Sequence, residues 1–196
     1  MAIYRLVAFT SLLTLAGLSA LDSKAMMGEP PKSLGAYERR RLETNGVKGT
    51  LFFNCDDACT VAVNGKEVGK SSGRGAASAK VKLRPGDVIC VLARNMDGND
   101  GLALVFKAVD GKTSFSTSCE GWYEYVPPDP KTWGEVADLD NAALTSCRLG
   151  TNSKWKGSVE DLSGLLCPMC IWGGSGHTTT YILHVATYAD LADRGK

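Results

Sequence analysis

The sequence lacks the excess of one charge sign that proteins binding nucleic acids or anionic membranes carry. Its 22 lysines and arginines are balanced by 21 aspartates and glutamates, and the formal net charge is +1 at pH 7. The part expected to fold has no basic cluster, so neither nucleic acid nor an anionic membrane is expected as a partner. N-x-Ser/Thr sequons are also absent, which excludes N-linked glycans from the surface.

Residue combinations that support catalysis are missing as well. The sequence has two histidines, His177 and His184. No nucleophile and no pair of carboxylates stands in a pattern that would work with them or in their place. Because a candidate active site needs such a constellation, we expect a protein that is not an enzyme and uses no catalytic cofactor.

Long apolar runs are limited to one, at the N-terminus. Arg5 precedes an apolar segment, residues 6–18, which ends at Ser19 and Ala20. This order is typical of a secretory signal peptide, here residues 1–20. The segment is shorter than the roughly 20 apolar residues that span a bilayer, although an uncleaved anchor is the alternative. A secreted protein, extracellular or at the cell surface, is therefore expected, without membrane contact after signal cleavage.

The next segment, residues 21–46, is poor in apolar side chains and contains Pro30-Pro31 and the basic triplet Arg39-Arg40-Arg41. This composition predicts neither strand nor helix. Two interpretations are open: a flexible arm, or a short propeptide that is removed at the triplet. Residues 47–188 are expected to form one domain with a full core, and residues 189–196 a polar tail.

The strongest fold signal lies in residues 60–95. Its first strand turns at Asn64-Gly65, the pair that favours a type I′ hairpin turn. Residues 84–87, Arg-Pro-Gly-Asp, carry the signature of a second turn. Residues 88–93 are apolar on both faces, as in an interior strand. Further strands are expected at residues 50–54, 102–108, 114–119 and 179–187. The pattern predicts an all-β protein, an antiparallel β-sandwich.

Two stretches are expected to depart from strand structure. Residues 122–133 are predicted to be irregular, because Pro127, Pro128 and Pro130 each lack a donor for the sheet ladder. Residues 138–149 are expected to hold one helical turn. In the last strand, alternation places Tyr181, Leu183 and Val185 on one face and the intervening residues on the other.

These segments also resemble a known family. VAVNGKEVG (residues 61–69), LRPGDVICVLARN (83–95), GWYEYVPPDPKTW (121–133) and CIWGGSGHTTTYILHV (170–185) are similar to the galactose-binding-like jelly roll that accompanies β-galactosidases and α-rhamnosidases. The resemblance covers residues 49–188. It implies a jelly-roll topology, carbohydrate binding, and turns that hold the sandwich together rather than contact sugar. The sequence departs from that family in its cysteine content and in having no attached catalytic domain.

Seven cysteines in a secreted chain predict disulfides, with one thiol left over. Cys55 and Cys59 flank a turn and would lie within bridging distance if they faced each other across a hairpin. Cys167 and Cys170 have a spacing that also occurs in redox and zinc sites, but the all-β context favours a disulfide. The disulfide candidates are Cys55, Cys59, Cys119, Cys147, Cys167 and Cys170, and their connectivity is open.

Aromatic side chains are the best ligand-binding candidates. A flat ring can stack on the apolar face of a pyranose while polar neighbours bind its hydroxyls. The candidates, which lie in an expected loop region, are Trp122, Tyr123, Tyr125 and Trp133. Trp172, beside the last strand, is expected in the core.

A structural calcium ion is a weaker hypothesis. The oxygens of Asn95, Asp97 and Asn99 suit Ca²⁺, although the loop lacks the distal Glu of a 12-residue calcium loop. The alternative is an ordinary polar turn, and no other metal site is expected.

Two functions follow from these observations. The first is a secreted, non-catalytic, lectin-like module that binds a glycan or polysaccharide. The second is a structural extracellular subunit of a wall, matrix or filament, joined to itself or to other extracellular proteins. The sugar, the oligomeric state and cleavage at Arg39-Arg40-Arg41 stay open at this point.

Overall fold

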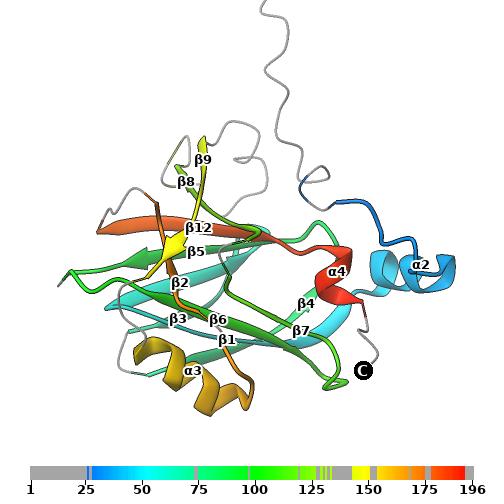
Figure 1. The fold of residues 1–196 in the computed structure, drawn as a ribbon, viewed down its shortest axis with the longest axis horizontal. Helices are drawn as coiled ribbons and strands as arrows, with labels where there is room; N and C mark the ends of the chain where they lie inside the picture. Colours follow the sequence, from blue (N-terminus) through cyan, green and yellow to red (C-terminus); the bar gives the residue numbers. More distant parts are fainter. Residues whose placement is uncertain are drawn as a thin grey trace, which may run out of the picture.

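A computed structural model of the chain describes residue 26 and residues 28–72, 75–96, 98–118, 120–126, 129, 131, 133, 143–150, 154–167, 169–174 and 178–192. Two six-stranded sheets are formed, and their paired strands run antiparallel. The sheets stack face to face with a core between them (Figure 1). The prediction of an antiparallel, mostly β architecture compatible with a sandwich is confirmed.

Sheet A has the order β10-β11-β6-β1-β4, and β7 also pairs with β6. Its strands are β1 (Val47–Cys55), β4 (Ala77–Leu83), β6 (Leu102–Ala108), β7 (Ser114–Ser116), β10 (Arg148–Leu149) and β11 (Ile171–Trp172). Sheet B has the order β3-β2-β5-β12-β8-β9. Its strands are β2 (Ala58–Val63), β3 (Lys66–Ser71), β5 (Val88–Arg94), β8 (Trp122–Val126), β9 (Ala143–Ser146) and β12 (Thr179–Val185).

The two predicted turns form as expected and are tied to each other. Asn64 and Gly65 adopt positive φ values of 48° and 76°, as a type I′ turn requires between β2 and β3. In the second turn, Gly86 has a φ of 90° and the Asp87 N–H donates to the Arg84 carbonyl. The Asn64 side chain donates to the Asp87 carboxylate at 2.8 Å and accepts from the Val88 N–H. Side-chain hydrogen bonds thus join the β2–β3 turn of sheet B to the turn that connects β4 of sheet A with β5 of sheet B.

Among the described residues, three helices lie outside the sheets. Helix α3 (Lys154–Ser163) covers the outer face of sheet A, where Val159 is buried beside Ala103 and Val105. Helix α2 (Ala36–Asn45) and helix α4 (Tyr188–Leu191) lie side by side at one end of the sandwich (Figure 1). In the part of the chain that the structure describes, no helix is long and apolar enough to cross a bilayer.

The structure corrects several sequence expectations. Residues 36–45 were expected to lack regular structure but form α2, because Leu42 is fully buried against the core. Residues 122–126 form a strand, since the prolines begin only at residue 127. One helical turn was expected within residues 138–149. Residues 143–146 and 148–149 form β9 and β10 instead, residues 138–142 lie outside the described residues, and a helix follows later, in α3. Residues 189–191 were expected in a polar tail but belong to α4, where Leu191 is fully buried.

Candidate binding face on sheet B

The candidate site begins with the alternation of side chains in β8. Trp122 and Glu124 point between the sheets, whereas Tyr123 and Tyr125 point to the outer face of sheet B. Trp122 is 1% exposed, and its ring stacks on His184 with ring centroids 4.7 Å apart. The structure therefore separates Trp122 from the other three predicted ligand residues and places it in the core.

The remaining three predicted residues gather on the outer face of sheet B with one further ring, Tyr181. Tyr125 and Tyr181 are cross-strand partners in the pairing of β8 with β12, with ring centroids 5.7 Å apart in an edge-to-face arrangement. Trp133 lies 6.4 Å from Tyr181, measured between ring centroids. We call Tyr123, Tyr125, Trp133 and Tyr181 the aromatic patch.

The patch has a buried base and half-buried rings above it. Tyr125 is 1% exposed and packs with Val88, Cys90 and Leu183. Tyr123, Trp133 and Tyr181 are half-buried, so each offers part of its surface to a ligand. The packing holds these rings before any ligand arrives, which lowers the conformational entropy lost on binding. Tyr125 is thus a supporting residue, and the other three are the contact candidates.

The patch is supported from the inner side of sheet B by a buried polar contact. The Thr180 hydroxyl donates to the Glu124 carboxylate at 2.8 Å, which joins β12 to β8 directly beneath the patch. Gly173 packs against this pair: a Cβ there would lie 2.4 Å from both the Glu124 oxygen and the Thr180 oxygen. Only glycine therefore fits at this position without disrupting the contact.

Tyr181 is the residue that sequence reasoning left out of the site. The alternation in the last strand placed Tyr181 on one face with Leu183 and Val185, but residues 122–133 were interpreted as irregular. Without a β8 strand there was no register to place Tyr123 and Tyr125 beside Tyr181. Trp172, expected in the core, is fully buried as predicted.

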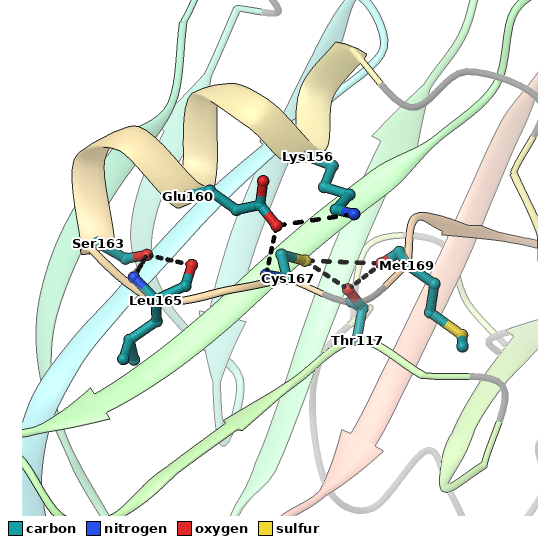
Figure 2. A network of polar contacts seen from close by, with 7 residues as sticks. All are labelled: Thr117, Lys156, Glu160, Ser163, Leu165, Cys167 and Met169. Carbon is teal, nitrogen blue, oxygen red and sulfur yellow. Dashed lines mark hydrogen bonds and ion pairs between the residues drawn. The ribbon is translucent and has the colours of Figure 1, made fainter.

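The Cys167–Cys170 segment follows α3 and is held by a polar network (Figure 2). The Cys167 N–H donates to the Glu160 carboxylate at 2.8 Å, and the Cys167 sulfur lies 3.5 Å from the Thr117 hydroxyl. Burial raises the pKa of the Cys167 thiol and raises the pKa of Cys170 to about 11. Raised pKa values disfavour the thiolate form that a redox-active cysteine needs.

Cys55 and Cys59 do not face each other across a hairpin, because β1 and β2 belong to different sheets. Both thiols are buried, and burial is the main cause of the raised pKa of Cys55, with the neighbouring Cys59 thiol acting in the same direction. Among the described cysteines, which include the buried Cys147, no disulfide is formed. Cys119 lies outside the described residues. The predicted bridges therefore stay predictions.

Two of the residues proposed as calcium ligands, Asn95 and Asn99, make other contacts. The Asn95 side-chain oxygen accepts a hydrogen bond from the Gly98 N–H at 2.9 Å, which is the geometry of a polar turn. Asp97 lies outside the described residues, and Asn99 is engaged in another contact. Within the described ranges, no three His, Cys, Asp or Glu residues form a group that could hold a metal ion. Calcium binding by Asn95 and Asn99 stays a prediction without support from their geometry.

No family model matches this sequence, and comparison with curated proteins and with solved structures found no similar protein.

Proposed function

We propose that this chain is a secreted, non-catalytic carbohydrate-binding module whose ligand lies on the outer face of sheet B. The observation that carries the proposal is the aromatic patch, with half-buried Tyr123, Trp133 and Tyr181 above the buried Tyr125. Aromatic rings bind the C–H face of a pyranose, and the phenol hydroxyls add hydrogen bonds to its substituents.

The proposed mode of binding is passive recognition by a fixed surface. Tyr123 and Tyr125 belong to β8 and Tyr181 belongs to β12, so the sheet sets their spacing, and Trp133 lies beside Tyr181. His184 of β12 pairs with Asp190 of helix α4, and both of its ring nitrogens contact oxygens, at 2.7 Å from the Gly121 carbonyl and 3.1 Å from Asp190. This histidine is engaged in packing and in tying α4 to β12, and the proposal gives it no role in ligand chemistry.

The test is retention of the purified chain on immobilised polysaccharides, followed by titration calorimetry with soluble oligosaccharides. We expect Trp133→Ala and Tyr181→Ala each to raise Kd about tenfold, which corresponds to the loss of one aromatic contact. Tyr37→Ala is the matched control, because Tyr37 lies on α2 and is 83% exposed away from the patch. Thermal unfolding of each variant separates lost binding from lost folding.

Any one of three outcomes would contradict the proposal: the wild-type chain binds no polysaccharide, the patch variants bind as well as the wild type, or the chain releases reducing sugar from a bound glycan. Non-reducing electrophoresis addresses the structural-subunit hypothesis: a ladder of covalent oligomers that collapses on reduction would favour an extracellular assembly component instead.

A further inference from the structure

Sheet B also carries a cleft of about 500 Å³, separate from the aromatic patch. Its lining comes from β2, β3 and β5 and includes Thr60, Lys70, Ser72, Leu92 and Arg94. Val91 and Ala93 of β5 belong to the core between the sheets, whereas Cys90 packs with the outer-face residues. By strand alternation, Leu92 and Arg94 therefore share the outer face with the aromatic patch.

The cleft carries positive charge that is available to a ligand. Arg94 is exposed, and within the described part of the chain its guanidinium forms no hydrogen bond or ion pair. Lys70 pairs with Glu67 at 3.2 Å, but the two side chains are 63% and 53% exposed. Such exposed pairs contribute little and exchange readily for another anion. Asp57, whose backbone bridges to Arg94, uses its carboxylate to accept the Met96 N–H.

The cleft and the aromatic patch lie in one row across sheet B. Thr60 is the cross-strand partner of both Lys70 and Leu92, and Leu92 is in turn the partner of Tyr181. Three strand spacings separate β3 from β12, which places Lys70 about 14 Å from Tyr181 along the row. One oligosaccharide could therefore contact the rings and the cations together.

We infer that the glycan bound by this module is anionic, and that Arg94 and Lys70 form the subsite for its acid groups. This inference rests on the proposed function. A guanidinium binds carboxylate and sulfate groups through two parallel N–H donors, which a neutral sugar cannot accept in that form. The Thr60 and Ser72 hydroxyls in the cleft lining add donors for the remaining oxygens of the acid group. Lys70 adds a movable point charge at the far edge.

The experiment compares three soluble probes in titration calorimetry: oligogalacturonate, a sulfated galactan oligosaccharide and a neutral galactan oligosaccharide. We expect the wild-type chain to bind one acidic probe at least tenfold more tightly than the neutral one. Arg94→Gln should remove about tenfold of the affinity for the acidic probe and leave the affinity for the neutral probe unchanged. Lys70→Gln should have a smaller effect in the same direction. Arg40→Gln, an exposed arginine on α2, is the control.

The two acid classes are distinguished by which probe Arg94 discriminates, and salt provides a second readout. Raising the salt concentration to about 1 M shortens the Debye length to about 3 Å and should weaken binding of the acidic probe alone. Equal affinity for neutral and acidic probes, or an Arg94→Gln variant with unchanged affinity, would overturn this inference while leaving the proposed function intact. Acidic binding that survives Trp133→Ala would instead count against the proposed function, because the cations alone would then account for it.

Discussion

Gly49 in β1 offers the sharpest test of the core packing, because its neighbours leave no room for a side chain. A Cβ at this position would lie 2.5 Å from the Phe106 ring and 2.6 Å from the Lys107 carbonyl oxygen. Phe106 in turn stacks on Phe115 at 5.2 Å between ring centroids, and Phe115 contacts His184 at the same distance. Gly49→Ala must therefore displace a ring that other rings hold in place.

The magnitude follows from two opposing effects. Alanine in a strand is favoured over glycine by about 0.5–1 kcal/mol, because it restricts the unfolded chain. Overpacking a dense core by one methyl group costs about 1–3 kcal/mol, and displacing a stacked ring costs about 0.5–1.5 kcal/mol more. The clash wins, and we expect a net loss of about 2 kcal/mol. For a chain of this size the melting temperature should fall by about 4–8 °C.

The assay is urea unfolding followed by circular dichroism, with two companion variants. Gly157→Ala in α3 is the matched control: no atom lies within 4 Å of the added Cβ, so the same substitution should stabilise the protein by about 1 kcal/mol. Phe106→Leu combined with Gly49→Ala should cost less than the sum of the two single changes, because the smaller side chain yields space. A neutral Gly49→Ala, or strict additivity of the pair, would refute the packing argument.

Two further predictions concern titratable groups. Asp190→Asn should destabilise the protein by about 2 kcal/mol near neutral pH. Burial acts to raise the pKa of the Asp190 carboxyl, but the hydrogen bond and charge of His184, with donors from Thr187, outweigh it and hold the pKa below its ordinary value. The stabilisation of the fold by the ionised Asp190 is therefore complete above about pH 4 and is lost as the pH falls through the lowered pKa. If the wild type stays more stable than Asp190→Asn by the same amount in urea unfolding at strongly acidic pH, this reasoning is wrong. If the predicted bridge from Cys55 to Cys59 forms, an alkylating reagent should label Cys55 only after both denaturation and reduction, as measured by mass spectrometry. Labelling after denaturation alone would exclude that bridge.

Sequence reasoning located the features that depend on neighbours in the chain. The Asn64-Gly65 and Arg84–Asp87 turns need particular backbone angles that few residues adopt, so their residue types identify them. Strands β5 and β12 are buried along most of their length, as interior strands are, and their continuous apolar runs identify them in the sequence. Which strands pair across a sheet depends on long-range contacts, so the meeting of Tyr125 with Tyr181 had no local signal.

The helices were missed for a related reason. Helix α2 buries only Leu42 among its described residues, so it shows no apolar periodicity. It is supported instead by the ion pairs of Arg41 with Glu38 and Arg39 with Glu43, and by packing at the end of the sandwich. The sequence also did not reveal the positive charge of the cleft, because Lys70 and Arg94 are far apart in the chain. Their strands, β3 and β5, lie in one sheet because β2 pairs with both.

The packing of α2 against α4 has a consequence for how the domain can be attached to other structures. The Tyr188 hydroxyl donates to Glu43, and the Arg39 guanidinium lies 5.9 Å from the centre of the Tyr188 ring. Helices α2 and α4, which flank the strands in the chain, therefore lie at one pole of the domain, an arrangement found in proteins that tolerate insertion into a host chain. A tether or fusion partner joined directly to either helix would start from this pole, and a short linker between the two helices should permit circular permutation with new ends in an exposed loop.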